Sequence, residues 1–324
     1  MPMSPQPLPP GLGESFSVGE AHVKGVTRSR TRARDLEAPF HGVRRRAGAE
    51  IALSEAPLAR DRATRERVLR DARALAQVMP SHAFFTGRTA AVLLGLPLDA
   101  GDALDVGTFL PQRGVRRPGV HGRRLTPGYA SVRFEDGIRM SSPASTWAML
   151  GGELDERELV RLGDAIVRIP RDRSGAHRPE LQLATPGELR AALDAGRRAG
   201  AERLRGALTR IRVGSMSPLE TDARLEVADA GLPEPELDVE IRAARSGRLL
   251  GIADARFPEY RVLLEVEGDH HRTDRRQWAR DIEKHAAYAA EGYETVRVTG
   301  VQVRECPAQA IALIRAALLR GGWC

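Results

Sequence analysis

The residues best suited to chemistry are acids inside an apolar segment, ADARFPEYRVLLEVEGDHHR, which covers residues 253–272. Side chains alternate between the two faces of a strand, so residues 262–267 predict one apolar face and one face that carries Glu265 and Glu267. Asp254 precedes this strand, and an antiparallel hairpin would bring it beside Glu265. A carboxylate that leaves water costs several kcal/mol or takes a raised pKa, so these acids need deep hydration, a partner or a cation.

A magnesium ion is the cation that this pattern favours, because Mg²⁺ prefers carboxylate oxygens and water. Asp254 and Glu265 are its expected ligands. Two histidines follow the strand, and exposed turn residues are the ordinary interpretation of such a pair. We keep that interpretation for His270, whereas the acids upstream favour a role for His271 in proton transfer near neutral pH.

The elements that must position these residues lie between residues 213 and 324. Their order predicts helix, three strands, helix, strand and helix, an α-β-β-β-α-β-α arrangement. The first helix has strong start signals, because Ser217 and Glu220 have capping-box spacing and Pro218 occupies the first helical position. Glu220 therefore has two interpretations, helix capping and membership of the site, and both stay open.

The chain before residue 213 predicts a different kind of structure. Residues 1–35 are rich in Pro, Gly, Ser and Arg without apolar periodicity, which predicts a disordered basic segment. A basic arm that follows a phosphate backbone is the functional alternative for this segment. Residues 36–212 mix helical patterns with short strands and predict an α+β module that serves as a scaffold or binds DNA. The expected division is thus 1–35, 36–212 and 213–324.

The composition of the 324 residues indicates a globular protein that suits a polyanionic partner. Hydrophobic residues make up 42%, and the formal net charge is +7. All basic residues except Lys24 and Lys284 are arginines, so a genomic arginine bias explains the charge equally well. Cys306 and Cys324 fit neither a disulfide framework nor a metal-ligand spacing. Without a signal-peptide pattern or a run of about 18 apolar residues, we expect a cytoplasmic protein with no membrane partner.

The acids, the Gly and His after them and the order of elements resemble the PD-(D/E)XK nuclease superfamily. The most similar branch contains the very-short-patch-repair endonucleases and the domain of unknown function 559. The resemblance covers residues 217–323 and rests on Asp254, ten intervening residues, the segment 265–268, a histidine, a helix and the strand YETVRVT. It implies a restriction-endonuclease-like fold, of the α+β or α/β class, for the C-terminal domain.

The resemblance also implies roles for individual residues. Asp254 and Glu265 match the metal-binding acids, and His271 matches the histidine of the branch. Glu267 stands where many members carry lysine, so the identity of the general base stays open. Further implied positions are an accessory acid, two helix residues and three phosphate-contacting cations: Glu220, Gln277, Asp281, Arg272, Lys284 and Arg297. An ordinary solvated stripe is the alternative for the polar residues of that helix, and its apolar residues Trp278 and Ile282 are expected in the core.

A weaker resemblance concerns the preceding region. FFTGRTAAVLLGLPL and GIRMSSPASTWAML are similar to the region before such nuclease domains in actinobacterial proteins with the architecture of abortive-infection type IV antitoxins. The winged-helix DNA-binding head of those antitoxins would lie before Phe84. Here that stretch is short and rich in proline and arginine.

These observations support two main hypotheses. The leading one is a Mg²⁺-dependent DNA endonuclease that acts in DNA repair or phage defence. The alternative is a non-catalytic DNA-binding or antitoxin-like regulator that keeps the nuclease fold as a scaffold. An RNA-directed nuclease has the same sequence features. We expect no small-molecule cofactor, and self-association into a homodimer stays open.

Overall fold

A computed structural model describes residues 6–47, 59–268 and 275–324. In these ranges the chain combines helices with β-sheets, which confirms the expected α+β class. None of the helices described there is long and apolar enough to cross a bilayer. The chain divides into two compact units, and each unit draws on two stretches of sequence. The first combines residues 1–153 with 188–201, and the second combines 154–187 with 202–324.

This division differs from the boundary that we expect at residue 213. Helix α5 (Glu156–Val167) lies on the N-terminal side of that position, and it packs on helix α8 (Pro218–Asp229). Hydrogen bonds join the two helices, from Arg161 to Asp222 and from Thr221 to Asp164. The second unit therefore includes helices that the sequence pattern assigned to the preceding module.

Residues 6–47 contain a small folded sheet in place of the disorder that we expect for residues 1–35. Its strand order is β1-β3-β2, with antiparallel pairing. The elements are β1 (Ser15–Ser17), α1 (Val18–Val23), the 3₁₀ turn η1 (Arg30–Arg32), β2 (Leu36–Glu37) and β3 (Val43–Arg46). A small core beneath them contains Leu12, Phe16, Ala21 and Val26. These apolar residues occur singly among polar ones, so they produce no periodic pattern.

The rest of the first unit is built around a mixed five-stranded sheet in the order β6-β5-β4-β8-β7. Its strands are β4 (Ala83–Phe85), β5 (Leu104–Phe109), β6 (Val120–Leu125), β7 (Val132–Glu135) and β8 (Ile138–Ser141). The helices are α2 (Ala59–Ala76), α3 (Gly87–Leu93) and α4 (Pro143–Met149), and α6 (Pro186–Asp194) spans the division at residue 188. The short strands and the helices that the sequence pattern predicts over this stretch are confirmed.

The second unit holds a four-stranded sheet in the order β12-β11-β10-β9. Its strands are β9 (Glu236–Arg242), β10 (Leu249–Phe257), β11 (Val262–Glu267) and β12 (Glu294–Thr299), with the 3₁₀ turn η3 (Pro258–Tyr260) between β10 and β11. Strand β11 is antiparallel to β10 and parallel to β12. The remaining elements are η2 (Pro179–Leu181), α7 (Ala201–Arg210), α9 (Arg275–Ala290), α10 (Gly300–Arg304) and α11 (Pro307–Arg320). From α8 onward the expected order of elements is present, with the short helix α10 added.

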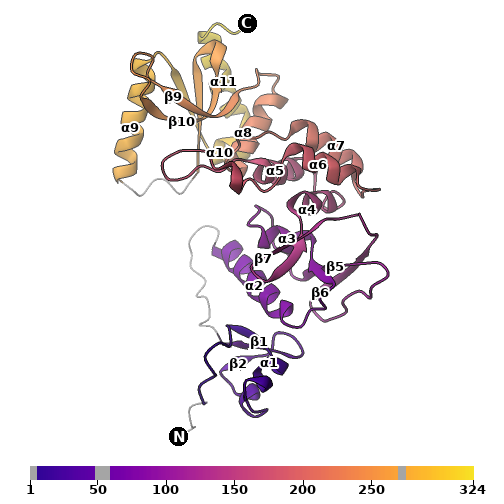
Figure 1. The fold of residues 1–324 in the computed structure, drawn as a ribbon. Helices are drawn as coiled ribbons and strands as arrows, with labels where there is room; N and C mark the ends of the chain where they lie inside the picture. The colour runs from indigo at the N-terminus through magenta and orange to yellow at the C-terminus, as the bar shows by residue number, and fades with distance from the viewer. Residues whose placement is uncertain (1–5, 48–58, 269–274) are drawn as a thin grey trace. The chain divides into compact units, whose positions relative to one another are not determined.

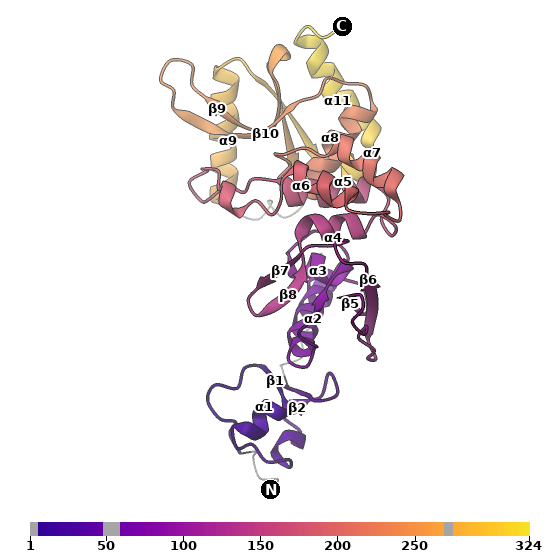
Figure 2. The same ribbon diagram turned by 45° about the vertical axis from the view of Figure 1, so that its right-hand side comes forward.

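Helices cover both faces of this sheet (Figure 1). On one face, Val262 and Leu264 share a core with residues of α8 and α11. On the other face, Leu263 and Ala253 share a core with Tyr288 of α9. The rotated view of Figure 2 also shows α9 apart from α11, with the strands of the sheet between them. Strand alternation therefore sorts β11 into two faces as predicted, but the face that carries the acids lies beneath a helix.

Candidate active site

The candidate site lies where strands β10 and β11 end their regular pairing. The ladder between them includes Ala255 opposite Leu264, and continuing that register places Asp254 opposite Glu265. The side chain of Asp254 reaches across to β11, where its Oδ2 accepts a hydrogen bond of 2.7 Å from the main-chain N–H of Val266. The antiparallel hairpin that the sequence predicts is thus confirmed, and it brings these two carboxylates together.

Lys284 of α9 neutralises one of these acids. Its Nζ donates to both carboxylate oxygens of Glu265, at 2.9 and 3.0 Å. Glu265 is 8% exposed, so this charge pair is largely removed from water. The resemblance implies that Lys284 contacts nucleic acid, whereas the structure turns its ammonium group to the acid in the sheet.

Gly251 of β10 makes room for this arrangement. A Cβ atom at Gly251 would lie 2.4 Å from the hydroxyl of Tyr288 and 2.8 Å from Cδ of Lys284. Both are closer than a real Cβ contact allows, so a larger residue at 251 would force the two α9 side chains to shift. The Tyr288 hydroxyl is itself buried without a hydrogen-bond partner among the described atoms.

Glu220 adds a third carboxylate, from the first turn of α8. Ser217 caps that helix as predicted, because its Oγ accepts from the main-chain N–H of Glu220 at 3.2 Å. The carboxylate of Glu220 turns back to accept from the N–H of Met216 at 2.8 Å. Its electrostatic interaction with Asp254 also places Glu220 in the acidic group. The Ser217 cap is thus confirmed, but the carboxylate of Glu220 bonds the N–H of Met216 rather than that of Ser217 and does not complete a capping box. Membership of Glu220 in the site stays a prediction.

The three carboxyl groups hold protons more strongly than usual. Burial raises the pKa of Glu265 to about 7, and the neighbouring charge of Asp254 adds to this while Lys284 opposes it. Burial likewise raises the pKa of Glu220 to about 7, with Asp254 as the next cause. The pKa of Asp254 is also raised, mainly by burial, although its hydrogen bond from Val266 acts in the other direction. Acids with pKa values near neutrality can give and take protons under working conditions.

Asp238 of β9 is a fourth acid at this site, and sequence reasoning missed it. Its neighbours Leu237 and Val239 pair with the residues on either side of Asp254, so Asp238 lies opposite Asp254 across the β9–β10 ladder. The negative charge of Asp238 raises the pKa of Asp254. Its φ of 53° is in the left-handed region, which costs a non-glycine residue on the order of 1 kcal/mol. The acidic alternation of ELDVEIR was a signal for this position.

Arg171 and His177 hold Asp238 in place. Nε of Arg171 donates to both carboxylate oxygens at 2.8 and 2.9 Å, and its Nη2 donates to the carbonyl of Asp238 at 2.9 Å. Nε2 of His177 lies 2.6 Å from Asp238 Oδ2. Residues 168–178 are distant in sequence and carry no motif, so nothing in the sequence pattern connects them to the acids.

Among the other residues implied by the resemblance, some have described side chains and the rest lie outside the described residues. Glu267 forms an ion pair with Arg297, which lies opposite Glu265 in the parallel β11–β12 register. Asp281 of α9 is half-buried, and its charge raises the pKa of Glu265. The side chain of Gln277, and all of His270, His271 and Arg272, lie outside the described residues.

The chemistry of the acids fits a hard divalent cation. Carboxylate oxygens are the ligands that Mg²⁺ prefers, and a cation would offset both the burial of these negative charges and the repulsion between them. Each carboxylate offers about four lone-pair positions, so Glu265 can accept from Lys284 and ligate an ion as well. Among the described residues, no group of three or more His, Cys, Asp or Glu side chains has the arrangement of a complete metal site. Asp254 and Glu265 are adjacent acids, and a cation bound between them stays a prediction.

Comparisons with known proteins give no match. No family model matches the chain, and no curated protein or solved structure shows significant similarity to it. The geometry of the acids is therefore the basis for the function proposed below.

Proposed function

We propose that the second unit is a restriction-endonuclease-like domain of the PD-(D/E)XK type and that the protein is a Mg²⁺-dependent DNA endonuclease. The observation that carries this proposal is the placement of Asp254 and Glu265 side by side on an antiparallel pair of strands, with Lys284 at hydrogen-bonding distance. The order of α8, β9, β10, β11, α9, β12 and α11 agrees with the resemblance seen in the sequence. The raised pKa values add support, because catalytic acids and bases require them.

The proposed reaction is hydrolysis of a phosphodiester. Asp254 and Glu265 would hold Mg²⁺, which when bound polarises a phosphoryl oxygen and lowers the pKa of water. Water adds to phosphorus, one P–O ester bond breaks, and the leaving alkoxide takes a proton. Glu220 is suited to proton transfer, because Oε2 accepts from Met216 and leaves Oε1 to hold a proton near neutral pH. Lys284 limits the repulsion among the acids when they are ionised.

Cleavage of supercoiled plasmid tests this proposal. The full chain is incubated with plasmid and MgCl₂ beside the variants Asp254→Asn, Glu265→Gln and Glu294→Gln. Glu294 is the matched control, because it is an acid of the same sheet that forms an ion pair with Arg320. We expect nicking by the wild type and by Glu294→Gln, and a loss of about 100-fold or more in both site variants. Equal nicking by all four proteins would assign the activity to a contaminant and contradict the proposal.

A non-catalytic DNA-binding regulator is the second candidate. It is favoured by the engagement of two cations expected to contact phosphate, since Lys284 pairs with Glu265 and Arg297 pairs with Glu267. Under this alternative the protein binds duplex DNA but leaves plasmid intact at every metal tested. A parallel assay with a labelled RNA of the same sequence separates DNA cleavage from RNA cleavage.

A further inference from the structure

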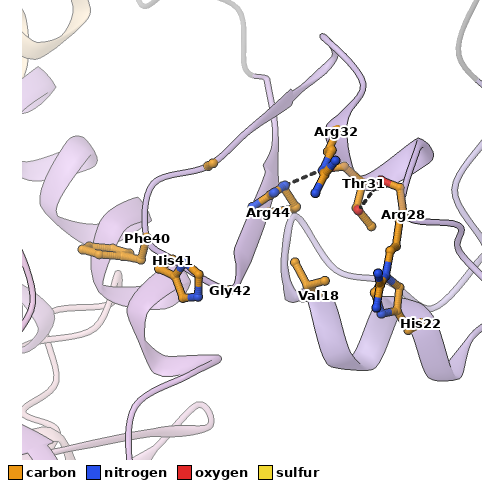
Figure 3. Close-up of a pocket in the computed structure, with 10 residues that line it drawn as sticks. Val18, His22, Arg28, Thr31, Arg32, Phe40, His41, Gly42 and Arg44 are labelled. Carbon is orange, nitrogen blue, oxygen red and sulfur yellow. Dashed lines mark hydrogen bonds between the residues drawn. The ribbon is translucent and has the colours of Figure 1, made fainter.

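A hollow in the N-terminal sheet region gathers basic side chains. It has a volume of about 410 Å³ and lies within residues 18–44 (Figure 3). Its lining includes three positively charged side chains, Arg28, Arg32 and Arg44, and two histidines, His22 and His41. None of the described residues that line it is an aspartate or glutamate. Like charges gathered without acids repel one another, and an anion would relieve that repulsion.

The acids of the surrounding segment are engaged elsewhere. Residues 6–47 contain four of them, and each forms an ion pair: Glu14 with Arg70, Glu20 with Lys24, Asp35 with Arg30, and Glu37 with Arg45. Arg28 and Arg32 have no ion pair with any described residue, and both are exposed. The segment holds eight arginine and lysine residues against four acidic ones, a net charge of +4 with histidine neutral. The acids of this segment therefore do not neutralise the arginines that line the hollow.

Part of the hollow is held in a fixed orientation. Nε of Arg44 donates to the carbonyl of Thr31 at 2.5 Å, and its Nη1 donates to the carbonyl of Val43 at 2.7 Å. The hydroxyl of buried Thr31 donates in turn to the carbonyl of Arg28 at 2.9 Å. These bonds leave Nη2 of Arg44 without a partner among the described residues. Figure 3 shows Arg44 extending toward Arg32, and Arg28 extending toward His22.

We propose that this hollow is a phosphate-binding site and that its ligand is the sugar–phosphate backbone of nucleic acid. Each guanidinium group presents several N–H donors in one plane, which match the oxygens of a phosphate. Because the hydrogen bonds of Arg44 already restrict its side chain, it loses less conformational entropy on binding. A free nucleotide or inorganic phosphate offers the same chemistry as one backbone phosphate. The net charge of the segment favours a polyanion, because several phosphates then contribute at once. The site is separate from the acidic group and requires no cleavage reaction.

Fluorescence anisotropy with a labelled DNA duplex tests the proposal, in EDTA so that metal-dependent cleavage does not interfere. The double variant Arg28→Gln/Arg32→Gln removes two charges from the hollow. The matched control, Arg34→Gln/Arg46→Gln, removes two exposed arginines of the same segment that do not line the hollow. We expect the hollow variant to bind at least tenfold more weakly and to reduce the slope of log K against log[salt] by about 2, with at most a twofold change in the control. Equal losses in both variants, or no loss in either, would overturn the site.

Two further arms identify the ligand. If a nucleotide monophosphate or inorganic phosphate at millimolar concentration displaces the duplex and raises Tm in the wild type only, the site binds free phosphate and the nucleic-acid assignment fails. If polyglutamate competes as well as DNA at equal charge, the site is not specific for phosphate and the proposal fails.

Chemical modification of the wild-type arginines by phenylglyoxal is a test that needs no variant. Bound DNA is expected to protect Arg28 and Arg32 but not Arg34 and Arg46, and the reverse pattern would contradict the site even if the double variant failed to fold.

Discussion

Asp164 and Glu265 are buried acids of the same unit, and their surroundings differ in kind. Asp164 is 1% exposed and accepts hydrogen bonds from Arg224 Nη2 at 2.8 Å, from Thr221 Oγ1 at 2.9 Å and from the N–H of Arg212 at 2.8 Å. Arg224 is itself buried. This acid therefore has a permanent counter-charge and a full set of donors, which is the arrangement of a structural ion pair.

Glu265 has a smaller set of partners and more negative neighbours. Lys284 is its hydrogen-bond donor among the described residues, and Asp254 lies beside it. Asp254 has a main-chain N–H as its donor and faces the charge of Asp238. Burial alone therefore does not distinguish a structural acid from a chemical one. The distinction lies in whether the nearest charges neutralise the acid or repel it.

The largest expected effect of a single substitution comes from Asp164, the structural acid of this pair. Asp164→Ala leaves the buried guanidinium of Arg224 without its carboxylate, so we expect the free energy of unfolding to fall by about 3–5 kcal/mol. Urea denaturation followed by circular dichroism measures this change. Asp229→Ala is the control, because Asp229 forms ion pairs at an exposed position and should cost under about 1 kcal/mol. Similar losses in the two variants would remove the distinction drawn here.

The next prediction concerns the pH dependence of stability. Glu220 and Glu265 have pKa values raised from 4.5 to about 7 in the folded chain, so between these values the native state binds more protons than the unfolded state. The free energy of unfolding must then fall as pH rises, by up to about 3 kcal/mol per acid at 1.36 kcal/mol per pK unit. Urea denaturation from pH 5 to pH 8 should show this slope in the wild type.

A double variant isolates the contribution of the site to that slope. The pKa of Asp164 is also raised by burial, so it adds a slope of the same sign in every variant that retains it. Glu220→Gln/Glu265→Gln should flatten the curve relative to the wild type. Addition of MgCl₂ should stabilise the wild type more at pH 8 than at pH 5, because the cation binds the ionised acids. Parallel pH curves for the wild type and the double variant would show that Glu220 and Glu265 do not have raised pKa values in the folded chain.

The smallest effect is expected at Gly251, and it tests whether Lys284 needs the space at this glycine to pair with Glu265. Gly251→Ala would push against Tyr288 and Lys284, so we expect a loss of about 1–3 kcal/mol from overpacking. Displacing Lys284 should also steepen the fall in stability between pH 5 and pH 8, because Glu265 then loses its counter-charge. Gly268→Ala is the control, since a Cβ there meets no atom of the described residues within 4 Å. Unchanged stability and slope in Gly251→Ala would mean that Lys284 does not depend on this gap.

Local patterns predicted the strands and helices of the second unit well. Alternation in β11 and the cap at Ser217 are short-range features, and both are confirmed. The pairing of Asp254 with Glu265 followed from one hairpin. These predictions succeeded because the residues concerned are neighbours along the chain or across one turn.

Predictions that depend on tertiary packing were less successful. Ile282 was expected in the core but is 49% exposed, so this prediction is wrong. Helix α9 contacts the sheet through Tyr288 and Lys284. Because one of these contact residues is charged, the spacing of apolar residues does not identify the buried face of the helix. Arg171 approaches Asp238 from 67 residues away, and no spacing rule connects them. The roles proposed for Glu267 and Arg297 remain predictions.

The alternation of sequence between the two units has a consequence for how the protein is made. Residues 1–153 of the first unit are synthesised first, followed by 154–187 of the second, 188–201 of the first and 202–324 of the second. The chain therefore changes unit at three positions. Arg224 emerges 60 residues after Asp164, the buried acid that it pairs with. A fragment that begins at residue 213 would contain the acidic group but lack α5. Its Arg224 would then have lost Asp164, the carboxylate that it pairs with. A fragment intended to contain the whole second unit should therefore start before Glu156 and retain residues 188–201, so that both stretches of the unit are present in one chain.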